Sequence, residues 1–345
     1  MTQATAERPA PVFDAQRAVR RLRGRHFELL NVLGSEHSVR AAARKMALTQ
    51  PALSKMLREV EESFGTQLFT RSRAGVTPTP AGRHLIAYAT ATLNGLAAVG
   101  SDVQRIAGGE AVRLRLGTFS VIPCVPRAIA CLLGRAPRVT VRVQEGHGSA
   151  LLGALAAGEI DCIVAALPPE LLQATDVDAL RVETLYDDEL CVVASAAHPL
   201  ARSRSLRWEH LAGSRWALPP QESLLRRALI DMHLRAGLAP PAPVAEMMSP
   251  LLLAELIDRD PTLLSVMRLE RTDSEQRSGR IRRLNLTPKA ALPPMSLITL
   301  RAAGPREDVI TALRAALREV VPASSQTDGP RTLRRAVPPA PGSRQ

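Results

Sequence analysis

A pair of short helical patterns joined by a tight turn, within residues 38–64, limits the fold of this 345-residue chain more than any other feature. Ser38 is a suitable N-cap for the first helix, and Thr49 is a suitable N-cap for the second. In the second helix the apolar residues recur at steps of 4, 3 and 4, at Leu53, Leu57, Val60 and Phe64. This spacing predicts one buried stripe, so the sequence indicates a small helical domain whose second helix has one exposed face.

The exposed face of that second helix carries polar and basic side chains in its first turns. Hydrogen-bond donors at the start of an exposed helix suit the base edges of the DNA major groove. Ser38 and Arg40, at the start of the preceding helix, belong to the same predicted DNA-binding surface. The candidates from the second helix are Gln50, Pro51, Ser54, Lys55 and Arg58.

A short basic turn follows the second helix, where Arg71 and Arg73 flank Ser72 with no acidic residue nearby. This pattern fits a wing whose arginines contact phosphate groups or the minor groove. The alternative is an ordinary helical hairpin with a solvated basic face. The combination of caps, stripe, donors and basic turn favours a winged helix-turn-helix.

The distribution of charge supports a nucleic acid partner at one end of the chain. The formal net charge is +12, and residues 20–83 hold twelve basic and five acidic residues, a net charge of +7. Residues 111–322 are only slightly positive. A small basic module beside a nearly neutral one is typical of a DNA-binding domain attached to another domain.

A single long helix is predicted from Thr79 to about Ala107, because Thr79 is a good N-cap, Pro80 suits the first turn and two glycines follow. Apolar or small residues recur along it at alternating steps of 4 and 3, a heptad pattern. We expect this helix to pair with a second copy of itself, although it could instead lie on its own domain. The repeated positions are Leu85, Ala89, Thr92, Leu96, Val99, Val103 and Ile106.

Beyond residue 110, patterns of strands and helices alternate, which favours an α/β class with a parallel sheet covered by helices. The predicted strands are 112–118, 139–145, 160–165, 189–194, 263–267, 281–286 and 295–300. The predicted helices are 123–134, 149–157, 222–236, 249–259 and 305–320. Residues 1–20 and 323–345 are polar or rich in Pro, Ser and Arg, and we expect them to be disordered.

From Arg25 to about Val320 the sequence resembles the LysR-type transcriptional regulators. The most specific part is SVRAAARKMALTQPALSKMLREVEESFGTQLFTR at residues 38–71, followed by TPTPAG at 77–82. Weaker similarities are GEIDCIV at 158–164, LYDDELCVVA at 185–194 and HPLA at 198–201.

The resemblance implies an α/β protein with an N-terminal all-α winged helix-turn-helix at residues 21–79 and a linker and dimerisation helix at 80–109. Residues 110–322 would form an effector-binding domain similar to a periplasmic binding protein, with a cleft between two subdomains. Subdomain I would comprise about 112–186 and 288–322, and subdomain II about 187–287. The implied partners are double-stranded DNA, a small-molecule effector, further copies of the chain in a dimer and a tetramer, and RNA polymerase.

We expect the effector beyond the C-terminal ends of the strands, at helix starts, where unpaired backbone N–H groups favour anions. Thr118 and Ser120 follow the first strand of this domain, and the resemblance implies hydroxyl contacts there. Ser223 and Ser249 each precede a helix in the other subdomain, and all four residues could instead act only as helix caps. The expected ligand is a carboxylate or another polar organic molecule, and the sequence is similar to regulators of sugar or aromatic-acid catabolism.

Several other functions find little support. There is no GxSxG, HExxH, Walker or GxGxxG pattern, so no enzyme, catalytic residue or cofactor is predicted, and His147 between two glycines is interpreted as part of a flexible loop. A nucleoid-type structural DNA binder would not need the long α/β part. No apolar run is long enough to cross a membrane and no secretory signal is present, which predicts a cytoplasmic protein.

The four cysteines form no CxxC pair and no cluster with zinc spacing, so no metal site is predicted. We interpret them as reduced, mostly buried thiols. A regulator of the same fold that senses oxidants through its cysteines remains the main alternative. The cysteines are Cys124, Cys131, Cys162 and Cys191.

Overall fold

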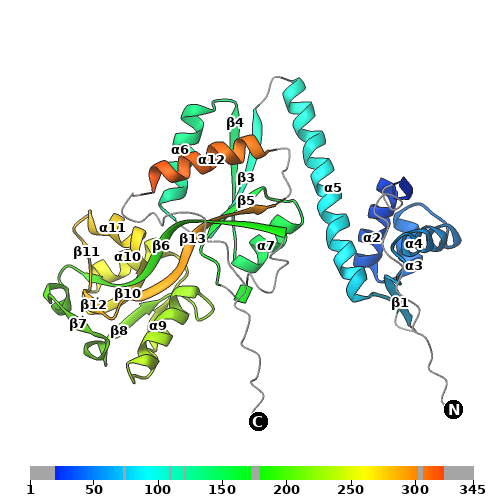
Figure 1. Ribbon diagram of the computed structural model, residues 1–345. Coiled ribbons are helices and arrows are strands. Elements are labelled where there is room, and N and C mark those ends of the chain that lie inside the picture. The colour runs from blue at the N-terminus through cyan, green and yellow to red at the C-terminus, as the bar shows by residue number, and fades with distance from the viewer. Residues whose placement is uncertain are drawn as a thin grey trace, which may run out of the picture. The chain divides into compact units, whose positions relative to one another are not determined.

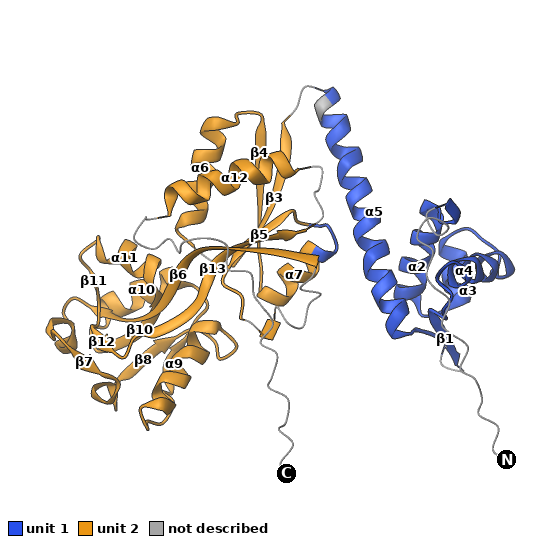
Figure 2. Cartoon of the chain, viewed as in Figure 1, with its two compact units in different colours: residues 1–109, 156–159 blue, residues 110–155, 160–345 orange. Residues whose placement is uncertain are grey.

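The structure is a computed structural model that describes residues 20–72, 75–108, 111–119, 122–168, 170–171, 179–301 and 306–321. The chain divides into two compact units (Figure 2). The first unit comprises residues 1–109 with 156–159, and the second comprises 110–155 with 160–345. Two predicted site residues, Arg73 and Ser120, lie outside the described residues.

The first unit begins with three helices, α2 (Gly24–Glu36), α3 (Val39–Lys45) and α4 (Gln50–Phe64), as Figure 1 shows in blue. Both predicted caps are confirmed. The Ser38 hydroxyl accepts from the backbone N–H of Ala41 (3.3 Å), and the Thr49 hydroxyl accepts from Ala52 (3.4 Å). Each cap satisfies one of the N–H groups that a helix start leaves without a partner.

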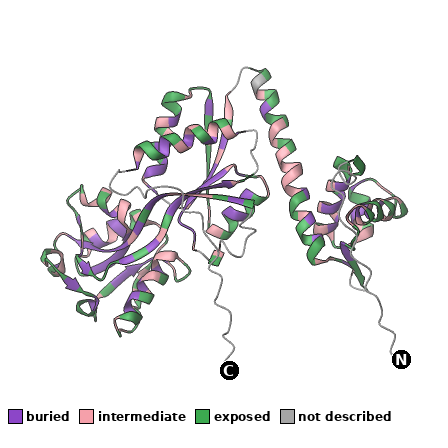
Figure 3. Cartoon of the chain, viewed as in Figure 1, coloured by how far each residue is buried: buried purple, intermediate pink, exposed green. Residues whose placement is uncertain are grey.

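Apolar side chains from these helices form a single core, and the helices carry buried residues, coloured purple in Figure 3. The predicted stripe of α4 faces this core, with Leu53, Leu57 and Val60 buried and Phe64 half-buried. Leu29, Leu30 and Leu33 of α2 pack against it. The 3.6-residue period of the sequence therefore correctly predicted which face of α4 is available to a partner.

A two-stranded antiparallel hairpin, β1 (Phe69–Ser72) and β2 (Gly75–Pro78), forms the wing. Gly75 has a φ of 123°, which side chains rarely permit, and a Cβ there would lie 2.5 Å from the carbonyl oxygen of His37. The N–H of Val76 donates to that same carbonyl at 2.9 Å. The hairpin is thus held against the turn between α2 and α3.

The long helix α5 (Pro80–Ala107) starts directly after the wing. The Thr79 hydroxyl donates to the carbonyl oxygen of Gln67 (3.0 Å) and accepts from the N–H of Gly82 (3.0 Å). A Cβ on Gly82 would lie 2.0 Å from the carbonyl oxygen of Leu68, so only glycine fits at this approach. The TPTPAG segment therefore fixes the start of α5 against β1.

The heptad stripe of α5 does not act as one seam, which corrects the sequence interpretation. Leu85 and Ala89 are buried in the core of the first unit, because the N-terminal turns of α5 pack on α2. Leu96 and Val103 are 68% and 60% exposed. The side chain of Ile106 lies outside the described part. The stripe therefore serves the chain's own domain at its start and leaves apolar side chains exposed further along.

The second unit contains a sheet of nine strands among the described residues. Its strands are β3 (Val112–Thr118), β4 (Val139–Glu145), β5 (Cys162–Ala165), β6 (Leu180–Ser195), β8 (Arg215–Leu218), β9 (Pro243–Glu246), β10 (Leu263–Arg268), β11 (Ile281–Arg283) and β13 (Ala290–Leu300). The short strands β7 (Leu206–Arg207) and β12 (Leu286–Thr287) pair separately. The helices are α6 (Cys124–Arg135), α7 (Gly148–Ala156), α9 (Leu224–Arg235), α10 (Pro250–Arg259), α11 (Leu269–Gln276) and α12 (Glu307–Val320).

The strand order is β4-β3-β5-β13-β6-β10-β8-β9, with β11 also paired to β6. The outer pairs β3–β4, β3–β5, β8–β10 and β8–β9 are parallel, as predicted. The central pairs that involve β6 or β13 are antiparallel, so the expected parallel sheet is found only among the outer strands. The two long strands β6 and β13 run in opposite directions between the halves of the unit, which makes the centre of the sheet antiparallel.

The buried side chains separate into distinct cores on either side of these two long strands. On one half of the sheet, α6 and α12 cover one face and α7 covers the other. On the other half, α9 covers one face and α10 covers the opposite face. We call the half with α6, α7 and α12 subdomain I, and the half with α9, α10 and α11 subdomain II.

Candidate DNA interface and effector site

The predicted DNA-binding surface is exposed at the start of α4. Gln50, Pro51, Lys55 and Arg58 are exposed, and Ser54 is half-buried one turn after Gln50. Because α4 begins at Gln50, these side chains lie on its first turns, the part of a recognition helix that meets base edges. The first turns of α4 therefore expose polar and basic side chains.

The basic side chains of this surface are not neutralised within the described part of the chain. Arg40, Lys55, Arg58 and Arg71 make no ion pair and no side-chain hydrogen bond there. Lys45, by contrast, forms a 2.7 Å ion pair with Glu36. Unpaired cations beside a helix start favour a polyanion, since binding releases counterions from phosphate groups.

The candidate effector residues lie at strand ends and helix starts of the second unit. Thr118 is the last residue of β3 and is 5% exposed. Its hydroxyl donates to the carbonyl oxygen of Val164 on β5 at 2.9 Å. This bond stabilises the pairing of two strands, so the single hydroxyl proton of Thr118 is not available to a ligand.

Ser223 and Ser249 cap the helices that follow them. The Ser223 hydroxyl accepts from the N–H of Arg226 at 3.1 Å, and the Ser249 hydroxyl accepts from Leu252 at 3.4 Å. In each bond the serine is the acceptor, so its own proton can still be donated elsewhere. The cap interpretation thus has direct geometric support and is compatible with a second contact.

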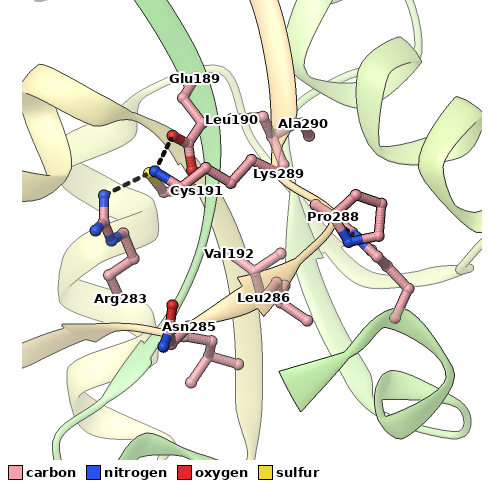
Figure 4. A pocket seen from close by; sticks show the side chains of 12 residues that line it. Glu189, Leu190, Cys191, Val192, Arg283, Asn285, Leu286, Pro288, Lys289 and Ala290 are labelled. Atoms are coloured by element: carbon pink, nitrogen blue, oxygen red, sulfur yellow. Dashed lines mark hydrogen bonds and ion pairs between the residues drawn. The ribbon is translucent and has the colours of Figure 1, made fainter. Parts of the chain in front are cut away.

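A small cavity occurs in subdomain II between β6, β11 and β13 (Figure 4). Arg283 reaches towards Cys191, with its Nη1 4.0 Å from the sulfur, and Lys289 forms a 3.2 Å ion pair with Glu189. Trp208 closes part of the wall. Thr118, Ser223 and Ser249, the predicted effector residues that the structure describes, do not line this cavity.

Sequence reasoning missed a group of charged and aromatic side chains near the crossing strands. Arg268 ends β10 and Glu270 lies in the first turn of α11, directly after the buried strand 263–267. Arg268 lies over the ring of Phe119, 4.9 Å from its centre. A basic and an acidic residue immediately after a buried strand was the available signal, because strand ends are where α/β proteins place functional side chains.

Comparison with known proteins identifies the family. A family model described as a bacterial regulatory helix-turn-helix protein of the lysR family matches residues 25–83. A second, described as a LysR substrate binding domain, matches residues 107–322, more than half of the chain. The chain belongs to the LysR family of transcriptional regulators. It is therefore a DNA-binding regulator with an effector-binding domain.

Two curated members of the LysR family are similar over most of this regulator. The transcriptional regulator GbpR of Azospirillum brasilense is 30% identical over 244 residues, which cover 70% of each chain. The transcriptional regulator GalR of Pseudomonas putida is 29% identical over 300 residues, 86% of this chain and 74% of GalR. Full-length OxyR from Pseudomonas aeruginosa shares the fold, with a TM-score of 0.58 and 23% identity over 89% of this chain and 98% of OxyR.

Three of the four thiols of this LysR-family regulator are buried. Burial and the negative charge of Glu270 raise the pKa of Cys124 to about 12, and burial raises the pKa of Cys191 to about 11. Burial likewise raises the pKa of Cys162. Since oxidants react with the thiolate, these three sites disfavour the redox-sensing alternative.

Of the described helices, none has the length and apolar content needed to cross a membrane. No cluster of His, Cys, Asp and Glu suited to a metal ion occurs among the described residues. The matched family is one of transcription regulators.

Proposed function

We propose that this regulator reads its operator with α4 and strengthens binding with the wing. The observation that carries the proposal is the exposed, unpaired basic surface around the start of α4, together with Gln50 and Ser54 on its first two turns. Base edges would be contacted by Gln50, Pro51 and Ser54. The sugar-phosphate backbone would be contacted by Ser38, Arg40, Lys55, Arg58, Arg71 and Arg73.

Operator binding at several salt concentrations tests this proposal. Gln50→Ala is expected to relax sequence preference, by about 1–3 kcal/mol for a lost base contact. Arg71→Ala is expected to weaken binding to every sequence and to lower the slope of log K against log salt by roughly one. Arg202→Ala, an exposed arginine of the second unit, controls for loss of charge. An unchanged slope for Arg71→Ala would rule out the wing contact.

We propose that α5 pairs two copies of the chain, and that dimers assemble further into a tetramer. Tyr88, Leu96 and Val103 are each at least 60% exposed on α5, which supports an apolar contact with a partner. A two-fold dimer would place two copies of α4 on a palindromic operator. RNA polymerase in the cytoplasm is the proposed further partner.

The proposed effector is a small polar organic molecule, such as a carboxylate, bound where Thr118, Ser120, Ser223 and Ser249 mark strand ends and helix starts. Helix N-termini attract anions through their unpaired N–H groups, which supports this assignment. The proposed role is control of sugar or aromatic-acid catabolism. Because the Thr118 proton is already donated to Val164, we expect Thr118 to contribute through its backbone and position.

A thermal-shift screen of the full chain against small organic acids and sugars tests the effector proposal. A ligand present at 100 times its Kd is expected to stabilise the second unit by about 2.7 kcal/mol. Hydrogen peroxide serves as the comparison for the redox alternative. A response to peroxide alone, lost on Cys124→Ser, would overturn the effector proposal.

A further inference from the structure

The two halves of the second unit are joined by a narrow part of the sheet. Strand β6 pairs with β10 and β11 only from Leu190 onward, and β13 pairs with β5 only from Ser296 onward. Between these points, β6 and β13 pair only with each other among the described strands (Figure 1). Two-stranded ribbons twist more readily than wide sheets. We call residues 184–189 and 290–295 the crossover.

The crossover is also irregular, which adds to its ability to bend. The register of β13 against β6 shifts twice between Leu292 and Ser296. Such shifts bend a strand and increase its local twist. The angle between the subdomains therefore needs support from side chains outside the ribbon.

Two side chains of the crossover contact residues at the junction of β10 and α11 in subdomain II. The Tyr186 hydroxyl donates to the Glu270 carboxylate at 2.6 Å, and Arg268 forms an ion pair with Asp188. Tyr186 and Asp188 are two residues apart on β6, so both point to the same face. Tyr186 and Asp188 are buried, and the side chains of Arg268 and Glu270 are at most 14% exposed.

Arg268 and Glu270 also contact subdomain I. The Glu270 carboxylate also forms an ion pair with Arg127 of α6, and Arg268 stacks on Phe119, directly after β3. Two arginines and two carboxylates balance one another, so the group requires no outside counterion. Buried charges persist when each is paired, and loss of one partner leaves the other uncompensated.

We propose that Arg127, Glu270 and Arg268, with their partners on the crossover, form an electrostatic latch that fixes the angle between the subdomains. The latch opposes bending of the crossover. Its link to regulation rests on the proposed effector site, because Phe119 lies between Thr118 and Ser120. A ligand that moves Phe119 would loosen its stacking with Arg268 and shift the balance between closed and open subdomains.

Hydrogen exchange of the full-length protein without ligand tests the latch. Arg127→Ala removes one partner across the subdomains, and Arg127 is exposed enough to tolerate it. Glu270→Gln removes the charge and keeps an oxygen that can accept from Tyr186. The matched control is Arg135→Ala on the same helix, which breaks the ion pair with Glu319 inside subdomain I.

Both latch variants are expected to exchange roughly three- to tenfold faster in peptides from the crossover, and Arg135→Ala is expected to leave them unchanged. The double variant should exchange no faster than the faster single variant, because both remove the same contact. Arg127→Lys, which keeps the charge, should retain most of the protection. Unchanged crossover exchange in both single variants, or multiplied effects in the double variant, would overturn the proposal.

The hydrogen-exchange test of the latch can fail or succeed independently of the proposed effector function. If the effector proposal fails, the ligand screen gives no thermal shift while the latch variants still accelerate exchange. If the latch fails, ligand-induced shifts persist while crossover exchange does not respond to Arg127 or Glu270.

Discussion

Ser223 can cap α9 and contact a ligand at the same time, since its oxygen accepts from Arg226 while its proton remains available. Aspartate is as good an N-cap as serine, but it carries a negative charge. Ser223→Asp is therefore expected to keep the stability of the protein within about 0.5 kcal/mol. It should nevertheless lower affinity for an anionic effector by at least about tenfold.

Titration of the effector found by the screen, together with urea unfolding, checks this prediction. Ser249→Asp provides the equivalent test on α10. An effector response identical to that of the wild type in both variants would show that the two serines act only as caps.

His233 gives the second unit a predictable response to acid. Its side chain is 3% exposed and packs edge-on against Trp208 (5.8 Å between ring centres) and Trp216 (5.7 Å). Burial is the main cause that lowers the pKa of His233 below 6.5, and the positive charge of Arg226 lowers it further. A backbone hydrogen bond to Leu229 opposes this shift. The neutral ring is therefore the native form.

A lowered histidine pKa stabilises the folded state above pH 6.5, and this contribution is lost as the pH falls towards the folded-state pKa. We expect the unfolding free energy of subdomain II to decrease by at most about 1.4 kcal/mol per pH unit for this group. The chain's two tryptophans both contact His233, so their emission reports the transition directly. His233→Asn should flatten this slope, and an equal slope in the variant would assign the effect to other groups, such as His198.

At the scale of elements, α5 shows how one apolar pattern can serve two purposes. Its first turns bury Leu85 and Ala89 in the core of the DNA-binding unit, and its later turns expose Leu96 and Val103. A continuous heptad pattern thus combines intramolecular packing with exposed apolar side chains.

Leu96→Asp and Val103→Asp are expected to abolish the proposed dimer, because each would place a charge in an apolar contact at a penalty of several kcal/mol. Ser101→Asp, on the opposite side of the helix and already exposed, is the control and should leave the dimer intact. Sedimentation velocity measures the assembly state. Dimers that persist in both variants would place the interface outside α5.

At the scale of the whole molecule, the two units have separate hydrophobic cores. Operator DNA should therefore stabilise only the unit that binds it. At 100 times its Kd, DNA is expected to add about 2.7 kcal/mol to the first unit. Slower hydrogen exchange in α2 and α4, with no change in the tryptophan-detected unfolding of the second unit, would agree with this expectation. Equal stabilisation of both units would indicate strong coupling between them.

Features that depend on residues a few positions apart could be predicted from the sequence. Ser38 and Thr49 were recognisable as caps, and the stripe of α4 followed from its 3.6-residue spacing. The wing followed from the basic turn around Ser72, and the start of α5 followed from Thr79 and Pro80. The physical reason is that caps, helix faces and tight turns are set by local hydrogen bonds and local sterics.

Only the tertiary structure decided the features that join distant residues. Three such features each link positions more than 40 residues apart. They are the antiparallel pairing of β6 with β13, the hydrogen bond from Thr118 to Val164, and the hydrogen bond from Tyr186 to Glu270. The split in the α5 stripe likewise depended on where α2 packs. Local periodicity carries no information about which distant strand or charge becomes a neighbour, because packing and burial of the whole chain select that partner.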